Sequence, residues 1–145
     1  MRWSYGILAV GLVLTAAGAQ DDAAKKDLES LQGVWQFVSL EVEGKGLPED
    51  PDKPIKLIVK GNRAIHPGRE GKNKETIIRL DPSRKPKAID MSPLAGPDKG
   101  KAALGIYAID GDMLKICAGT LGKDRPTEFK AGKNVVLMVL KREKP

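Results

Sequence analysis

The chain has 145 residues, with 25 Lys and Arg against 19 Asp and Glu, so its formal net charge is +6 at pH 7. The positive residues are scattered and aromatic residues are few, whereas a nucleic-acid surface favours a dense basic stripe with aromatic side chains between. This composition therefore excludes nucleic acid as the expected partner. The single cysteine, Cys117, excludes an intramolecular disulfide, so packing alone must hold the fold together.

The first nineteen residues have the layout of a secretory signal peptide. Arg2 supplies a positive start, residues 7–17 form an apolar run, and residues 17–19 provide the small side chains of a cleavage site. The run is shorter than the ~20 apolar residues of a membrane-spanning helix. We therefore expect cleavage near Ala19 and export to the periplasm, the cell envelope or the extracellular medium. The exported chain, residues 20–145, is expected to have no transmembrane segment.

Beyond this segment, one helix and a series of strands are predicted. Residues 22–32 predict a helix of one to three turns, because apolar residues recur three and four positions apart and Gly33 ends the run. Short apolar runs bounded by Gly, Pro, Asn and Asp then predict strands, with Gly61-Asn62 and Asp110-Gly111 as hairpin turns. The expected strands are residues 35–42, 55–60, 63–66, 76–80, 87–91, 102–109, 112–118, 127–130 and 135–142.

Eight or nine short strands, joined mostly by hairpins, predict one all-β domain over residues 20–145, built as a single antiparallel β-barrel with a short N-terminal helix. The last strand is apolar at both odd and even positions over residues 135–140. A strand of this kind is covered on both faces. We expect the barrel interior to cover one face, and the N-terminal helix or a second subunit to cover the other.

Two short motifs, one at each end of the barrel domain, indicate how it closes. Gly33 and Trp35 form a Gly-x-Trp element at the first strand, and Arg142, or alternatively Lys141, provides a cation on the last strand. This combination resembles the lipocalin superfamily. The resemblance implies that Trp35 closes one end of the barrel and that the late cation stacks over its ring, a contact that contributes ~0.5–2 kcal/mol.

Further segments resemble a more specific group, an uncharacterised lipocalin-like domain family that is abundant in planctomycete bacteria. The resemblance spans nearly the whole chain after the signal segment. Because that family has no established biochemical role, the resemblance implies a fold and export but no activity. The segments that carry it are residues 31–35, 80–90, 105–117, 125–129 and 139–142.

Residue types suited to catalysis or to metal binding are sparse. His66 is the only histidine, and its position before Pro67 at the end of a strand favours a surface side chain over a metal ligand or a catalytic base. The acidic stretch at residues 49–52 lacks the spacing and the glycine of a calcium loop, which favours a solvated loop. Cys117 lies within a strand-like run, where a buried and inert thiol is expected. We expect no cofactor, no metal and no enzymatic activity.

Two carboxylates, Asp90 and Glu128, are candidates for acid–base chemistry. Each lies three residues after a cation, Lys87 for Asp90 and Arg125 for Glu128. We favour structural ion pairs that lock loops to the rim of the barrel.

The expected function is the binding of a small hydrophobic or amphipathic ligand in the barrel, with Tyr107, Arg125 and Phe129 near its mouth. A barrel of about eight strands has room for one small ligand or none. The alternative is a filled barrel that binds another exported protein through its outer face or loops. The interior distinguishes the two, because a filled barrel requires inward side chains to meet across the axis; those expected to do so are Trp35, Leu57, Ile78, Ile106, Leu114 and Leu137.

Overall fold

The computed structural model describes residues 16–46, 55–67 and 71–144, with side chains from residue 21 onward except that of Pro67. A helix, α1 (Ala16–Leu31), precedes nine strands. The strands are β1 (Gly33–Val42), β2 (Lys45–Gly46), β3 (Lys56–Lys60), β4 (Arg63–Pro67), β5 (Asn73–Asp81), β6 (Ala88–Pro93), β7 (Ala103–Asp110), β8 (Met113–Gly119) and β9 (Val135–Arg142). Residues 1–15 of the expected signal peptide and the acidic stretch at residues 49–52 lie outside the described residues.

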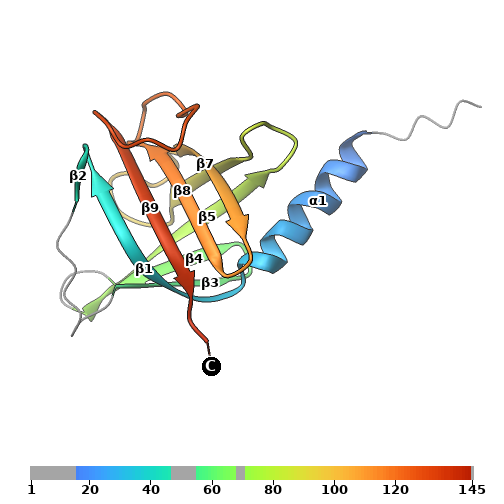
Figure 1. Ribbon diagram of the computed structural model, residues 1–145, viewed down its shortest axis with the longest axis horizontal. Helices are drawn as coiled ribbons and strands as arrows, with labels where there is room; N and C mark the ends of the chain where they lie inside the picture. The colour runs from blue at the N-terminus through green and yellow to red at the C-terminus, as the bar shows by residue number, and fades with distance from the viewer. Residues whose placement is uncertain (1–15, 47–54, 68–70, 145) are drawn as a thin grey trace, which may run out of the picture.

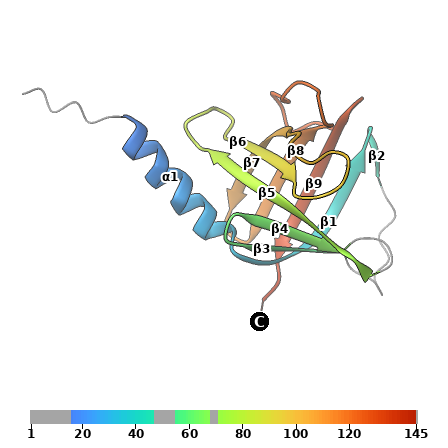
Figure 2. The ribbon, with the colours of Figure 1, turned by 180° about the vertical axis from the view of Figure 1, so that it is seen from behind.

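The strands form one antiparallel sheet that closes on itself. Neighbouring strands pair in the order β2-β1-β3-β4-β5-β6-β7-β8-β9, and β1 also pairs with β9. Eight strands therefore close a lipocalin-like barrel and β2 is an extra strand at its edge. Figure 1 shows β1, β8 and β9 on the near wall, and Figure 2 shows β3, β4 and β5 on the opposite wall. The predicted all-β barrel is confirmed.

Several predicted boundaries differ from the structure. Residues 127–130 are not a strand but belong to the long connection between β8 and β9, because Arg125 fastens this connection to the outside of the barrel. The short strand β2 and the polar start of β5, residues 73–75, lack the alternation of apolar residues that predicts strands. The helix begins at Ala16, within the segment assigned to the signal peptide, and is longer than the one to three turns expected.

The register shows which predicted core residues face the interior. Trp35, Leu57, Ile78 and Leu114 belong to the buried interior core, as predicted. Ile106 and Leu137 face outward instead, because each lies opposite Cys117 in its strand pair. The Cys117 thiol donates to the Lys130 carbonyl of the connection that covers the outside of the barrel. Ile106 and Cys117 are buried under this connection rather than across the axis.

The two ends of the barrel are built differently. One end carries the turns at residues 61–62, 82–87 and 111–112 together with the C-terminal end of α1. We call it the closed end. The opposite end, which we call the open end, carries the connections β2–β3, β4–β5, β6–β7 and β8–β9. Figure 1 shows α1 leaving the barrel at the closed end and projecting away from it.

Trp35 and Arg142 lie together at the closed end. Trp35 is fully buried, and the guanidinium carbon of Arg142 lies 4.3 Å from the centre of its ring. The two residues are also directly opposite each other in the pairing of β1 with β9. The predicted stacking of Arg142, rather than Lys141, over the indole is therefore present where the first and last strands meet.

Both side chains also bind the C-terminal end of α1. The indole nitrogen of Trp35 donates to the Leu31 carbonyl at 2.8 Å. The Arg142 guanidinium donates to the Gln32 carbonyl at 2.8 Å and to the Ser30 carbonyl. The last carbonyls of a helix have no partner within it, and a cation is favourable beside them. Arg142 therefore joins the last strand, the first strand and the helix.

Gly33 and Gln32 make the junction between α1 and β1 possible. Gly33 has a φ of +117°, which residues with a side chain rarely adopt. Space is not the constraint, since an added Cβ would lie 3.5 Å from an Arg142 nitrogen, in ordinary contact. The Gln32 amide pairs with both backbone groups of Gly61, at 2.8 and 2.7 Å, and so fastens the β3–β4 hairpin to the same end.

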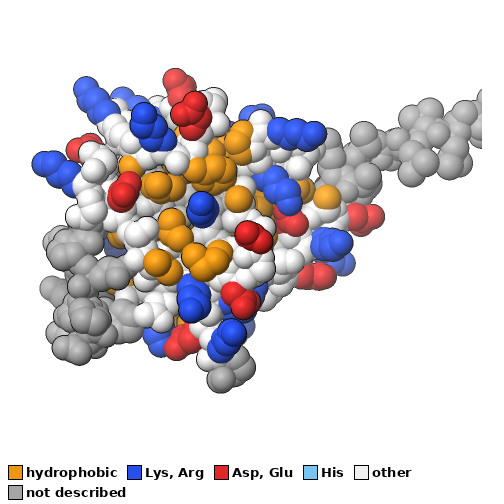
Figure 3. All heavy atoms as spheres, viewed as in Figure 1, with side chains coloured by type: hydrophobic (Ala, Val, Ile, Leu, Met, Phe, Trp, Pro, Cys, Tyr) orange, Lys and Arg blue, Asp and Glu red, His pale blue; other side chains and the backbone are white. Residues whose placement is uncertain are grey.

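The outer face of β9 is not covered by the helix, contrary to one of the two predicted arrangements. α1 packs beside β5 at the closed end. Figure 3 shows hydrophobic side chains gathered on the outer face over β1, β8 and β9, with charged side chains among them. Val38 of β1 is 44% exposed on this wall. Among the described residues, no helix has the length and apolar composition needed to cross a membrane.

Replacing Arg142 with Met keeps much of the aliphatic stem but removes the cation and its hydrogen bonds. We expect the free energy of unfolding of Arg142→Met to fall by about 2 kcal/mol, because the ring contact and the capped carbonyls are lost together. Urea unfolding followed by circular dichroism measures this. The matched control is Lys141→Met, whose side chain is exposed. Equal losses for the two variants contradict a special role of Arg142.

Candidate functional site

The interior of the barrel holds a cavity of about 370 Å³. Leu31, Leu57 and Leu114 line it toward the closed end, while His66 and Thr76 line it toward the open end. Most of its other lining side chains are aliphatic. Small-molecule sites commonly have volumes of about 300–1,000 Å³ and mostly apolar walls with a few polar groups. The cavity therefore matches a site for one small apolar chain or ring system.

The cavity exists because the inward positions carry side chains that are too small to fill the barrel. Aromatic residues make up only 4% of the chain. Two of the bulkiest, Trp35 and Tyr107, are fully buried but do not line the cavity. Phe37 is an aromatic lining residue, and Ala64 and Ala103 occupy positions where larger side chains would close the space. The predicted condition for a filled barrel is not met.

At the open end the cavity continues into a groove of about 760 Å³ on the rim. His66, Thr76 and Pro93 line both the cavity and the groove. His66 is half-buried and faces inward, like Ala64 two residues earlier on β4. His66 was predicted to be a surface side chain; it is partly exposed, and its strand position directs it into the mouth.

Lys74 lies beside His66 at this mouth. The two residues are opposite each other in the pairing of β4 with β5, and both line the groove. Lys74, Thr76 and Ile78 occupy alternate positions of β5 and so face the same side of the sheet, and Ile78 is buried in the interior core. Opposed residues on one face of an antiparallel pair have neighbouring side chains. Lys74 and Thr76 were not among the predicted site residues. The signal that identifies them is their position four and two residues before the inward-facing Ile78.

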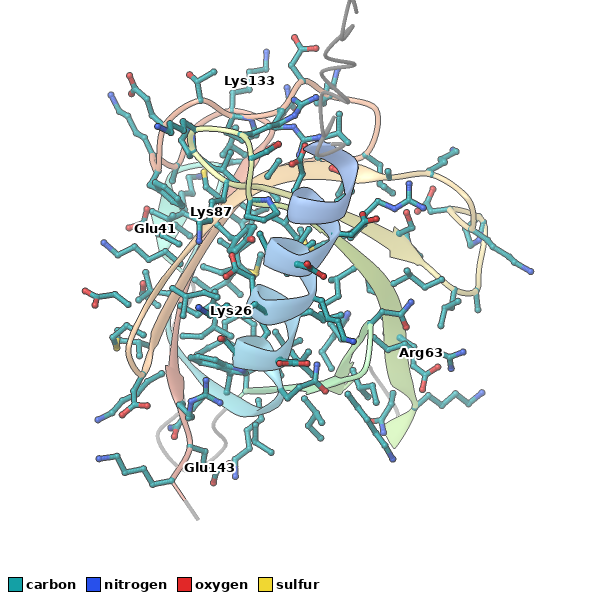
Figure 4. The ribbon with its side chains drawn as sticks, turned by 90° about the vertical axis from the view of Figure 1, so that its right-hand side faces the viewer. Lys26, Glu41, Arg63, Lys87, Lys133 and Glu143 are labelled. Carbon is teal, nitrogen blue, oxygen red and sulfur yellow. The ribbon has the colours of Figure 1, made fainter. Side chains whose placement is uncertain are left out.

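Tyr107, a predicted ligand-binding residue, lies at the closed end and does not line the cavity. Its hydroxyl donates to Asp27 of α1 at 2.7 Å, and Lys87 binds the same carboxylate oxygen at 2.9 Å. Burial, followed by the adjacent Asp27 carboxylate, raises the pKa of Tyr107. Figure 4, which looks onto α1, shows Lys87 next to the helix. This contact docks α1 on the barrel.

Arg125, the second predicted ligand-binding residue, lies outside the barrel wall. Its guanidinium is 2.7 Å from Asp90 and donates to the carbonyls of Ile89 at 3.2 Å and Gly105 at 2.8 Å. These partners belong to β6 and β7, so Arg125 fastens the β8–β9 connection to two strands. Phe129, the third predicted residue, is half-buried in the same connection and does not line the cavity.

The predicted ion pairs of Asp90 and Glu128 have different outcomes. Asp90 forms an ion pair, but with Arg125 rather than with Lys87, which binds Asp27. Glu128 is exposed, and within the described part of the chain it forms no ion pair. Closeness in the sequence did not predict the ion-pair partners, because Arg125 binds Asp90 of β6 instead of Glu128 in its own connection.

Residues that could hold a metal ion are dispersed. Over residues 16–46, 55–67 and 71–144, no three His, Cys, Asp or Glu side chains gather as a metal site would require. A second depression, of about 270 Å³, lies on the outside between Arg79, Arg84, Asp81 and Asp90. Arg84 binds Asp81 at 3.4 Å and Arg125 binds Asp90, so its charges largely neutralise one another. The interior cavity and its mouth are therefore the candidate site.

Comparisons with known proteins add no relative to this picture. The sequence matches no protein-family model and no curated protein, and no solved structure matches the fold. The candidate site therefore depends on its geometry alone.

Because Arg125 joins the β8–β9 connection to β6 and β7, its loss should lower stability. We expect Arg125→Met to reduce the free energy of unfolding by about 1–3 kcal/mol, since Asp90 and two carbonyls lose their partner. Lys123→Met, an exposed position in the same connection, is the matched control. Thermal unfolding of both variants measures the difference. A melting temperature of Arg125→Met equal to that of the control contradicts this structural role.

Cys117 should be chemically inert while the barrel is folded. It is fully buried, and burial raises the pKa of its thiol, with a smaller opposing contribution from the bond to Lys130. Because the thiolate is the reactive form, we expect no reaction with a disulfide reagent such as dithionitrobenzoate at pH 8 in native buffer. Full reaction should follow in 6 M guanidinium chloride. Rapid labelling of the native protein contradicts the burial of Cys117 under the connection.

Proposed function

We propose that this protein binds a small hydrophobic or amphipathic molecule inside its barrel and acts as a binding protein rather than as an enzyme. The observation that carries the proposal is the unfilled interior: a cavity of about 370 Å³ with mostly aliphatic walls and an opening to solvent at one end. Transfer of apolar surface from water into such a space is favourable by about 25 cal/mol per Å². A cavity of this size favours ligand binding over the alternative, a filled barrel that binds another exported protein.

The construction of the two ends supports the same proposal. The closed end is held by Arg142, Trp35 and α1, so a ligand has no route through it. The open end carries polar side chains, His66 and Thr76, where a polar group of the ligand remains near water. An apolar chamber with one polar mouth is an arrangement that fixes both the location and the direction of a bound molecule.

The resemblance noted in the sequence is part of this proposal. The contacts among Gly33, Trp35 and Arg142 support a lipocalin-like closure of the barrel. Membership of the lipocalin-like domain family abundant in planctomycete bacteria is proposed from the sequence segments alone. Export after cleavage near Ala19 is likewise proposed, from the pattern of residues 1–19. An exported binding protein encounters apolar molecules of the envelope or of the surroundings.

The direct test fills the cavity without changing its walls elsewhere. Ala64 is buried on β4 and lines the cavity. In titrations with the neutral fluorescent probe N-phenyl-1-naphthylamine, we expect one-to-one binding by the wild type and at least an about tenfold weaker affinity for Ala64→Phe, because the added ring takes the ligand's space. The melting temperature should stay the same or rise.

The control is Ala23→Phe, the same substitution at an exposed position of α1. It should bind the probe as the wild type does. Unchanged binding by Ala64→Phe contradicts the interior as the site. No binding of the probe by the wild type, together with no binding of long-chain alcohols in isothermal titration calorimetry, contradicts the proposed function itself.

A further inference from the structure

The rim groove shares three residues with the cavity, which makes the two a continuous space with different chemistry at each end. His66, Thr76 and Pro93 line both parts. Beyond them the groove is lined by charged residues, among them Lys74, Glu75 and Asp98. A molecule that fills the cavity therefore presents its outer end to this charged rim.

The carboxylates of the groove are each paired with a cation that does not line it. Glu75 binds Arg63 at 3.4 Å, and Asp98 binds Lys101 at 3.6 Å. Lys74 has no such counterion: within the described part of the chain no carboxylate lies in ion-pair distance of its amine. Among the described residues that line the groove, the charge without a counterion is therefore positive and is located at Lys74.

The position of Lys74 relates this charge to the mouth of the cavity. Lys74 is opposite His66 across β4 and β5, and Thr76 is the next inward residue on its own strand. A head group at the mouth thus lies beside the Thr76 hydroxyl and the Lys74 ammonium group. Anionic oxygens form shorter and stronger hydrogen bonds with such donors than neutral oxygens do.

We propose that the ligand is a single-chain amphiphile with an anionic oxygen head group, a carboxylate or a phosphate monoester, whose chain fills the cavity and whose head is held by Lys74 at the mouth. This inference rests on the proposed function and adds the class and the direction of the ligand. A volume of about 370 Å³ is at the small end of the range for ligand sites, which favours one chain over two.

The test compares three probes with the same chain: dodecanoate, dodecyl phosphate and dodecanol, each below its critical micelle concentration at pH 7.5. Isothermal titration calorimetry measures their affinities for the wild type, for Lys74→Glu and for Lys60→Glu. Lys60 is exposed at the closed end and carries the same charge change away from the mouth. Binding of dodecanol to each variant shows that the barrel is folded and the cavity intact.

We expect at least one anionic probe to bind the wild type about tenfold more tightly than dodecanol, and this preference to disappear in Lys74→Glu but not in Lys60→Glu. The tighter of the two anions identifies the head group. Equal affinity for all three probes overturns the anionic class and leaves the proposed function standing. A preference that persists in Lys74→Glu overturns the role of Lys74. Absence of binding by every probe overturns the proposed function as well.

Discussion

The contact between Arg142 and Trp35 at the end of α1 is the interaction on which the rest of the structure depends. A guanidinium stacked on an indole adds modest energy by itself. Here the same guanidinium also binds the carbonyls of Ser30 and Gln32, and the indole binds that of Leu31. The first strand, the last strand and the helix are thus joined at one point. The same two side chains therefore close the sheet and cover one end of the barrel.

This closure determines how the interior is used. Of the bulky side chains, Trp35 closes one end of the barrel and Tyr107 binds α1. The remaining inward positions are mostly aliphatic or small, and they leave a cavity instead of a packed core. The pairing of β1 with β9 removes the unpaired edges of the first and last barrel strands, and among the described strands the short strand β2 keeps one free edge. The accessible part of the interior is therefore at the open end, where Lys74, His66 and Thr76 line the groove.

The fold was predictable from the sequence because hairpin turns and apolar alternation are local signals. Asp110-Gly111 and the β7–β8 pair follow from them directly. The irregular conformation of residues 127–130 could not be predicted in this way. It depends on Arg125, which binds two strands distant in the sequence. Leu137 and Ile106 were assigned to the wrong face because a strand that is apolar at every position carries no parity signal.

The candidate site was less predictable than the fold. Tyr107, Arg125 and Phe129 were chosen for their chemistry, yet their places are set by α1 and by the β8–β9 connection. The mouth residues His66 and Lys74 are ordinary in sequence and become neighbours only through the β4–β5 register. Whether a barrel is filled depends on the sum of its inward volumes, which requires the register of all strands at once.

The most direct test of a sealed end and an open end is a crystal structure of the protein with 12-bromododecanoate, in which anomalous scattering locates the bromine. We expect one bromine site inside the barrel near Leu31 and Leu114, with the carboxylate beside Lys74. Bromine at the rim, or a barrel whose interior stays free of the probe while it binds elsewhere, would contradict the account.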